Sequence, residues 1–432
     1  MNFNGKAAIG KIVAMLLALT PIWAAEHYVS LDGLNNPPYT NWADAATNVI
    51  DAVTIAADGE TIWITNGVFN ITNTLNLNGR KTLRSVNGYA GTIINGMYNG
   101  STGNYVCMTA TSVCDGITIS NGYNYSYISD DARGGGGVLV SSACWLVNSK
   151  ITRCHGRYNS CGGGVRITGA GVMTNCIVHS NDVSGAYGGG LCLEGNALVQ
   201  DCLITDNQNV NYGGGIYFGG GFGTGAILRN CIVSNNTAAK FGAGQRADGG
   251  GIYMNGLGTV YNCLIINNVA GAWGCGGGVF AKNINNYAGK IVNCTIAGNY
   301  STNCGGLFLD GTNNTASIVN CIIYSNFTNS AYTAPSDVTF TNSLNTNAFL
   351  NCCLTNELPS DRNCIVLSPQ FIGFSSGNYR LRMTSPCVNA GTNQSWMTNA
   401  VDLDGNSRIL NGIVDLGAYE RYIWQGTVYH FQ

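Results

Sequence analysis

The middle of this 432-residue chain is built from copies of one short unit, and this repeat limits the possible folds more than any other feature. Each copy carries an Asn-Cys or Asp-Cys pair followed mostly by aliphatic residues, as in Asn230-Cys231-Ile232-Val233. Successive cysteines are separated by 26, 29, 32, 31, 27 and 31 residues. Periods of 20 to 50 residues are typical of stacked arrays. The repeat cysteines are Cys176, Cys202, Cys231, Cys263, Cys294, Cys321 and Cys352.

A glycine triplet followed by a short apolar stretch alternates with the cysteine fragment, as in Gly-Gly-Gly-Val-Arg-Ile at 162–167. The first and third residues after a triplet are apolar while the second varies, which is the period of a strand with one buried face. No long stretch here has helical spacing, and the units are shorter than the ~40 residues of a propeller blade. The sequence therefore predicts an all-β fold, a parallel β-helix, over residues 101–356.

The repeated Cys and Asn residues are predicted to form vertical ladders through the solenoid. Small buried thiols are common core residues, so the repeat cysteines are expected to point inward. Asn accepts left-handed corner geometry and can bond its copies in neighbouring coils. Because CxxC pairs are missing and the four histidines are scattered, no metal site is predicted. The predicted ladder residues are Cys176, Cys202, Cys231, Cys263, Cys294, Cys321, Asn230, Asn262 and Asn293.

One disulfide is a candidate on spacing. Cys275 and Cys304 both directly precede a glycine corner in successive coils. Their Cα atoms should therefore lie about 4.8 Å apart, inside the range that a disulfide bridges. The other connectivities stay open.

The composition excludes several classes of protein. A hydrophobic content of 45% is too high for a disordered chain, and seven prolines are too few for collagen. The net charge is −2 and only 10% of residues are charged, so no nucleic-acid partner is predicted.

The two ends differ from the repeats. Lys6 and Lys11 precede an apolar run at 12–22 that is shorter than the roughly 20 residues of a membrane span, which predicts a signal peptide over residues 1–25. The mature chain is then expected to be exported, without a transmembrane span. Residues 42–53 have the spacing of an amphipathic helix, which is predicted to cover the N-terminal end of the solenoid. Strands are predicted at 61–65 and 81–86.

Segments outside the repeats resemble known families. Residues 27–33 (His-Tyr-Val-Ser-Leu-Asp-Gly) and 58–64 (Asp-Gly-Glu-Thr-Ile-Trp-Ile) resemble the opening of exported right-handed parallel β-helix proteins of the pectate-lyase-like superfamily. The repeats resemble those of polymorphic outer-membrane proteins, which usually carry Phe where this chain has Cys. Residues 402–406 (Asp-Leu-Asp-Gly-Asn) and 415–420 (Asp-Leu-Gly-Ala-Tyr-Glu) resemble the choice-of-anchor domain lettered Q, which commonly ends bacterial surface β-helices.

These resemblances imply an architecture rather than an activity. They imply a right-handed β-helix in which residues 26–100 form the N-terminal cap and first coils, and residues 357–432 form a C-terminal cap. They also imply a secreted or cell-surface location, associated with the outer membrane.

The strongest candidate ligand site is an aromatic column after the glycine triplets. Tyr217, Tyr253, Phe280 and Phe308 occupy the outward position of successive strands. If exposed, this column would form a strip on which sugar rings can stack, since large exposed apolar patches mark contact surfaces. If covered by a loop or the C-terminal segment, the same column would be a second small core.

A catalytic alternative has fewer residues to support it. A glycosidase needs a carboxylate pair, and a lyase needs a basic proton acceptor with acids that hold calcium. His155, Arg157 and Arg166 lie within about one coil and are candidates for a basic site, whereas Asp182 and Asp206 recur beside the corner asparagines. We nevertheless expect acids and bases not to converge on neighbouring coils.

A last candidate concerns a cofactor. Residues 402–406 place oxygen ligands at alternate positions, as calcium loops do, but Ile413 stands where the bidentate Glu of such a loop would be. The alternative is a turn held by side-chain-to-backbone bonds, and no cofactor is predicted.

The sequence thus predicts a monomeric, non-catalytic β-helix that binds a polysaccharide, a matrix or a cell-surface ligand. The alternative is a polysaccharide lyase or glycoside hydrolase that acts on a groove of the helix.

Overall fold

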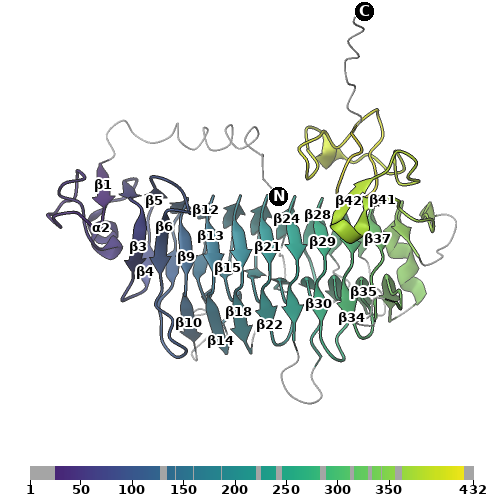
Figure 1. Ribbon diagram of the computed structural model, residues 1–432, viewed down its shortest axis with the longest axis horizontal. Coiled ribbons are helices and arrows are strands. Elements are labelled where there is room, and N and C mark those ends of the chain that lie inside the picture. The colour runs from purple at the N-terminus through teal and green to yellow at the C-terminus, as the bar shows by residue number, and fades with distance from the viewer. Residues whose placement is uncertain are drawn as a thin grey trace, which may run out of the picture.

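The computed structural model describes residues 25–126, 134–141, 143–158, 160–185, 187–219, 225–239, 246–282, 289–311, 316–328, 333–341, 343–355 and 362–422. Short strands wind into stacked coils, so that the molecule is an elongated solenoid with four parallel sheets along its sides (Figure 1). The four sheets are called A, B, C and D, and their strands are given below. A full coil in the middle of the chain contributes one strand to each of sheets C, A, B and D, in that order. The predicted signal peptide lies outside the described residues except for its last position.

Sheets A and B are the longest, with twelve and eleven strands. The strands of sheet A are β1 (Glu26–Val29), β2 (Thr61–Ile64), β5 (Thr82–Ser85), β8 (Val113–Asp115), β12 (Trp145–Val147), β16 (Val172–Thr174), β20 (Leu198–Gln200), β24 (Ile227–Arg229), β28 (Thr259–Tyr261), β32 (Lys290–Val292), β36 (Ser317–Val319) and β39 (Phe349–Leu350). The strands of sheet B are β3 (Gly67–Asn70), β6 (Thr92–Asn95), β9 (Thr118–Ser120), β13 (Lys150–Thr152), β17 (Ile177–His179), β21 (Leu203–Thr205), β25 (Ile232–Ser234), β29 (Leu264–Ile266), β33 (Thr295–Ala297), β37 (Ile322–Tyr324) and β40 (Cys353–Leu354).

Sheets C and D have ten and seven strands. The strands of sheet C are β4 (Leu75–Leu77), β7 (Val106–Met108), β11 (Val138–Val140), β15 (Val165–Ile167), β19 (Leu191–Leu193), β23 (Ile216–Phe218), β27 (Ile252–Asn255), β31 (Val279–Lys282), β35 (Leu307–Asp310) and β38 (Val338–Phe340). The strands of sheet D are β10 (Tyr123–Ser126), β14 (His155–Tyr158), β18 (Asp182–Ser184), β22 (Gln208–Asn209), β26 (Thr237–Ala238), β30 (Val269–Ala270) and β34 (Tyr300–Ser301).

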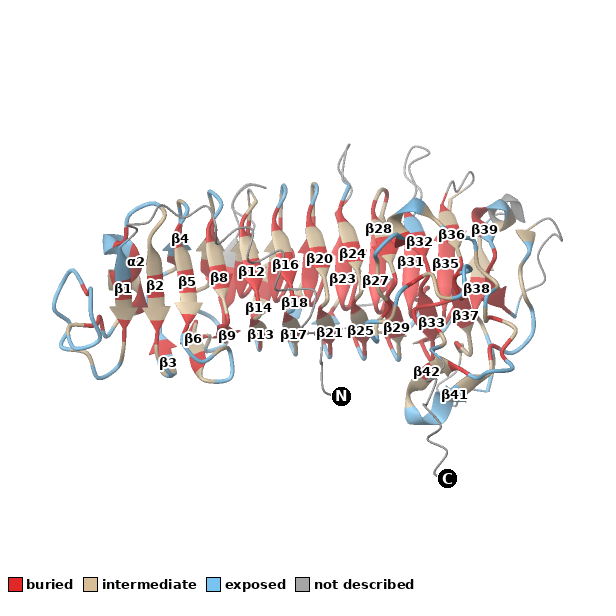
Figure 2. Ribbon diagram, turned by 90° about the horizontal axis from the view of Figure 1, so that it is seen from above, coloured by how far each residue is buried: buried red, intermediate tan, exposed pale blue. Residues whose placement is uncertain are grey.

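The predicted cysteine ladder is present inside the solenoid. Cys231, Cys263 and Cys294 are fully buried in the main core. The backbone N–H of Cys231 points at Cys263 Sγ at 3.5 Å, and that of Cys263 at Cys294 Sγ at 3.4 Å. The core runs the length of the solenoid as a continuous buried band (Figure 2). Stacked coils therefore place like side chains in vertical files.

Asparagine forms two ladders with different roles. The inner ladder is buried and ends at Asp337; Asn236, for example, donates both its backbone N–H and its Nδ2–H to Asn268 Oδ1 at 3.0 Å. The outer ladder lies at the corners before the cysteines, where Asn230, Asn262 and Asn293 have φ near +50°. Asn262 Nδ2 donates to Asn230 Oδ1 at 3.0 Å. The inner ladder contains Asn181, Asn207, Asn236, Asn268, Asn299 and Asn326.

The glycine triplets form the corner between sheets D and C. The first glycine of the triplets from residue 162 to residue 278 has a positive φ, and a Cβ at Gly188 would meet Leu191 O at 2.0 Å. Glycine is required there because both the backbone conformation and the close approach exclude a side chain.

The N-terminal helix is shorter than predicted. Helix α2 spans Val49–Ile55 and begins after Asn48, whose side chain accepts the backbone N–H of Ile50. The expected first turn is instead bridged to β1, with Ala46 N–H donating to Tyr28 O. Trp42 is consequently outside the helix. The helix still buries Val49, Ala52 and Val53 in the main core at the N-terminal end.

The C-terminal segment packs against the outer face of sheet B beside the last coils, rather than across the open end (Figure 1). It contains the antiparallel pair β41 (Phe371–Gly373) and β42 (Asn378–Leu381) with the short 3-10 helices η4 (Phe374–Ser376) and η5 (Ser395–Met397); another, η2 (Ser343–Ala348), precedes it. The fully buried Arg408 donates to Asn262 Oδ1 at 3.1 Å and pairs with Glu420 at 3.0 Å. The outer asparagine ladder therefore docks this segment.

Candidate functional site

The predicted aromatic column is a buried strip, so the expectation that it is exposed is wrong. Tyr217, Tyr253, Phe280 and Phe308 are only 2–7% exposed. Adjacent rings stack along the strip, with centroids 5.5, 4.9 and 5.2 Å apart. Burial raises the pKa of both tyrosines above its usual value. This geometry is that of the second small core, which was the other possibility open from the sequence.

Residues outside the column close the strip. The Tyr187 ring stacks on Tyr217 at 4.5 Å, and the Tyr212 ring lies 4.8 Å from Tyr253. The Arg246 guanidinium lies 5.5 Å from the Phe280 ring centre and is held by Asp248 at 3.2 Å. These contacts make a stacked and cation-capped cluster, in which the rings pack on other side chains of the described residues.

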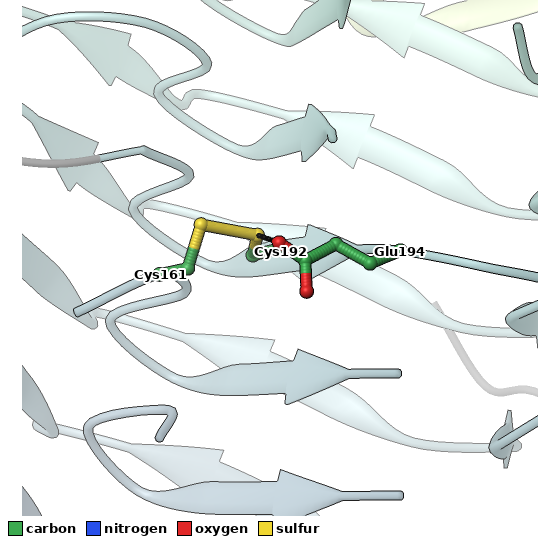
Figure 3. A group of neighbouring side chains, drawn as sticks. All are labelled: Cys161, Cys192 and Glu194. Carbon is green, nitrogen blue, oxygen red and sulfur yellow. Dashed lines mark hydrogen bonds between the residues drawn. A yellow bond between two sulfur atoms is a disulfide. The ribbon is translucent and has the colours of Figure 1, made fainter. Parts of the chain in front are cut away.

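The disulfide forms elsewhere than predicted. Cys161 is bonded to Cys192 with Cα atoms 5.4 Å apart, whereas Cys275 and Cys304 are free thiols (Figure 3). Cys161 precedes a glycine corner, and Cys192 occupies the column position of the next coil. Cys304 Sγ instead contacts Leu307 O at 3.2 Å, and burial raises its pKa to about 11.

The same disulfide bears on metal binding. Cys161, Cys192 and Glu194 offer three ligand atoms within 4.8 Å of one another (Figure 3). Bonded sulfurs supply no thiolate, which is the form that binds metal. Glu194 also forms an ion pair with Arg166 at 2.7 Å. This cluster is therefore a disulfide-crosslinked part of the fold.

Sheet D offers a more open surface. One outward position per coil forms the file Tyr123, His155, Asp182, Gln208, Thr237, Val269, Tyr300 and Phe327, each paired with the next in the parallel ladder. We call this file the flank. Every member after Tyr123 is partly or fully exposed. Its strands run in one row along the lower side of the molecule (Figure 1).

A cleft lies at the C-terminal end of the flank, where the solenoid meets the C-terminal segment. Its volume is about 350 Å³, and its lining includes Asn267, Phe327, Phe374 and Tyr379. Phe374 is 36% exposed, and its ring meets the buried Tyr379 ring edge-on at 5.7 Å. Burial raises the pKa of Tyr379 to about 12, so its phenol stays neutral. The lining of the cleft thus combines aromatic side chains with one amide.

An exposed tryptophan stands near this end of the flank. Trp273 is 68% exposed and follows β30 by three residues. Its backbone N–H donates to Thr302 Oγ1 in the next coil at 3.1 Å, and its φ is +66°. The loop therefore fixes the backbone of an indole whose ring is available to a ligand.

Charged side chains do converge at the other end, contrary to the sequence-based expectation. His155 Nδ1 lies 2.6 Å from Asp182 Oδ2 in the next coil, and Arg157 lies on the same strand as His155. The predicted basic trio is nevertheless split, because Arg166 lies on sheet C and pairs with Glu194. His179 and Asp206 form a second, looser pair at 3.6 Å on sheet B.

The acidic loop in the C-terminal segment is a hydrogen-bonded turn. Asp402 Oδ1 accepts the backbone N–H groups of Asp404 and Asn406 at 2.9 and 2.8 Å, and Oδ2 accepts that of Glu420 at 2.7 Å. Asp404 is paired with Arg380. These partners already use the carboxylate oxygens that were considered for calcium.

Comparison with known proteins supports the fold. A family model described as a right-handed β-helix region matches residues 163–349. The crystal structure of pectate lyase Pel9A is similar with a TM-score of 0.58 at 14% identity, covering 92% of this chain and 98% of that one. The pectin methylesterase PemA from Erwinia chrysanthemi has a TM-score of 0.35 at 11% identity, covering 73% and 92%.

No curated protein sequence matches this chain. Among the described residues, no helix has the length and apolar character needed to cross a membrane. The chain therefore has the fold of a right-handed parallel β-helix, the solenoid that it shares with pectate lyase Pel9A.

Proposed function

We propose that this protein is an exported, surface-associated polysaccharide-binding protein, and that the flank and its terminal cleft hold the ligand. The observation that carries the proposal is the 350 Å³ cleft with Phe327, Phe374 and Tyr379 in its wall. Sugar rings present apolar C–H faces that pack on aromatic rings, while the Asn267 amide can donate and accept hydrogen bonds to hydroxyl groups. A neutral site of this kind suits a carbohydrate better than an anion.

The shape of the flank favours an extended ligand. Phe327 follows Asp182 by five ladder steps, and neighbouring strands are about 4.8 Å apart, so the open part of the flank is about 24 Å long. A linear polymer anchored in the cleft can follow this row of exposed side chains. Pectate lyase Pel9A, which has the same fold, is named for a polysaccharide substrate.

The disulfide supports the proposed export. Disulfides persist in oxidising compartments and are rare in the cytosol, and Cys161–Cys192 closes a loop between successive coils. A monomer with this long, open flank suits attachment to a matrix or to another cell.

Binding to immobilised neutral and uronic-acid polysaccharides, measured by biolayer interferometry, tests the proposal. Wild type should bind at least one polymer of the panel. Phe374→Ala and Trp273→Ala should each raise the Kd for that polymer by roughly tenfold, because each removes a ring that contacts the sugar. Trp42→Ala is the matched control, because Trp42 is an exposed aromatic at the other end of the molecule. The proposal fails if wild type binds none of the panel, or if Phe374→Ala and Trp273→Ala both bind as wild type does.

A further inference from the structure

His155 lies between a carboxylate and a hydroxyl at the N-terminal end of the flank. Its Nδ1 is 2.6 Å from Asp182 Oδ2, and its Nε2 is 3.4 Å from Ser184 Oγ. Asp182 and Ser184 are two residues apart on β18, so both point to the same side of sheet D. His155 and Arg157, their ladder partners on β14, point to that side as well. The His155 imidazole therefore contacts both Asp182 and Ser184 of the next strand.

The two contacts use opposite nitrogens, which fixes the tautomer. A carboxylate only accepts, so Nδ1 carries the proton that is donated to Asp182. In the neutral imidazole Nε2 is then the acceptor, and it faces the hydroxyl of Ser184. A hydroxyl, an imidazole and an orienting carboxylate in this order are the parts of an activated serine nucleophile, and such contacts are often loose before substrate binds.

Aromatic packing holds the imidazole in place. The Tyr98 ring lies parallel to it with centroids 5.1 Å apart, and the Tyr123 ring lies 5.8 Å away in the preceding coil. The His155 side chain is only 13% exposed, whereas Asp182 is half exposed and Ser184 is partly exposed. The base is thus confined while the hydroxyl remains accessible.

The chain contains a second histidine that lacks this order. His179 Nε2 faces both Ser180 Oγ at 3.3 Å and Asp206 Oδ2 at 3.6 Å. Because the serine and the carboxylate share one nitrogen, a proton taken from Ser180 has no separate carboxylate on Nδ1 to support it. Thr152 Oγ1 lies at Nδ1 instead, at 3.5 Å. This pair is an internal control for geometry.

We propose that Ser184, His155 and Asp182 form a nucleophilic site that hydrolyses carboxylic esters. Ser184 Oγ attacks the ester carbonyl carbon while its proton passes to His155 Nε2. The carbon–oxygen bond to the alcohol then breaks, and the alcohol leaves with that proton. Water attacks the acyl-serine with the same base, giving the carboxylic acid and free Ser184, so one ester and one water yield one acid and one alcohol.

Arg157 is the charged partner of this reaction. Its Cα is the ladder partner of that of Ser184, so its side chain projects from the same face. A guanidinium there stabilises the negative charge that develops on the carbonyl oxygen. Asp182 acts as a positioning residue, since it contacts His155 rather than the ester.

The substrate class follows from the position of the site. It lies on an open flank, and a polymer anchored in the cleft about 24 Å away can bring an ester substituent to Ser184. The polymer part of the inference rests on the proposed function. The chemistry at Ser184 does not, because a small soluble ester can reach it.

A fluorophosphonate probe and 4-nitrophenyl acetate test the chemistry on the intact chain. The probe should label the peptide that contains Ser184, identified by mass spectrometry. Ser184→Ala and His155→Ala should lose the label and lower kcat/KM by at least roughly 100-fold. Asp182→Asn should slow labelling more than roughly tenfold and change its pH profile, as expected of a group that sets the tautomer. Ser180→Ala should behave as wild type.

Absence of labelling in wild type, or unchanged ester hydrolysis in Ser184→Ala, would overturn the inference. Ser184→Cys is a second variant of similar side-chain volume if the alanine variant is unstable. Its new thiol should react faster with iodoacetamide when His155 is present than in the His155→Ala background, as read from the peptide that contains position 184. Polysaccharide binding separates the two proposals. Ser184→Ala is expected to keep polysaccharide binding and to lose ester hydrolysis. Phe374→Ala is expected to lose polysaccharide binding and to hydrolyse the small ester as wild type does, because only the cleft is changed.

Discussion

The outward faces of sheets C and D arise from the same repeat but differ in how far their side chains are exposed to solvent. On sheet C, Tyr217, Tyr253, Phe280 and Phe308 stack as like residues and are closed over by other side chains. On sheet D, the side chains of the flank vary along the file, and those after Tyr123 are partly or fully exposed. Repetition of one apolar residue type builds a second core, whereas variation at an equivalent position leaves a surface with separate sites. The buried aromatic strip therefore stabilises the fold, whereas the exposed flank can contact a ligand.

The largest expected effect comes from the closed strip. Phe280→Ala should lower the free energy of unfolding by about 3–5 kcal/mol, because it removes a fully packed ring and leaves a cavity. Urea unfolding followed by far-UV circular dichroism measures this change. A loss below about 1 kcal/mol would be the cost of a surface residue and would refute the closed strip.

Reduction of the disulfide should have the next largest effect. Cys161 and Cys192 are 31 residues apart, and a crosslink of this span contributes about 2–4 kcal/mol. Cys192→Ser should reproduce the loss. This variant should also unfold at the same urea concentration with and without a reducing agent, because its remaining pair Cys275 and Cys304 are free thiols. A reductant-sensitive Cys275–Cys304 pair would instead restore the sequence-based prediction.

The outer asparagine ladder should contribute less. Asn262→Ala should cost about 1–2 kcal/mol, since Asn262 bonds Asn230, Val401 and Arg408. Asn175→Ala is the matched control: it has the same positive φ and bonds Asn148 in the same ladder, but it is exposed, whereas Asn262 is buried. Equal losses of stability in the two variants would mean that the ladder does not dock the C-terminal segment.

The smallest change in stability is expected on the open side. Trp273→Ala should change the free energy of unfolding by no more than about 0.5 kcal/mol, because the indole is largely in solvent. Thermal unfolding beside Phe280→Ala makes the comparison direct. A loss comparable with that of Phe280→Ala would show that Trp273 is a packing residue.

Features that recur in every coil were predictable from the sequence. The spacing of Cys231, Cys263 and Cys294 predicts their stacking because coil length and strand period leave one solution. The extent of the N-terminal helix was not predictable, since the bridge from Ala46 to β1 overrides local helical spacing.

Contacts that depend on single coils were also missed. Nothing repeated marks Arg246 as a cover of the strip, or Cys192 rather than Cys304 as a disulfide partner. Tyr187 and Tyr212 had a usable signal, since both directly precede a glycine triplet in successive coils. The His155–Asp182 pair had a usable signal: the two residues are 27 positions apart, which is one coil. The Ser184 contact follows from the alternation of side chains along β18, but only once the strand register is known.

Hydroxyl-radical footprinting of the native protein compares the two faces in one experiment. Trp273 and Phe374 should be oxidised rapidly, while Phe280, Tyr253 and their stacked neighbours should be protected until the protein unfolds. Oxidation of the sheet C rings as fast as Trp273 in the folded state would contradict the assignment of one closed and one open aromatic face.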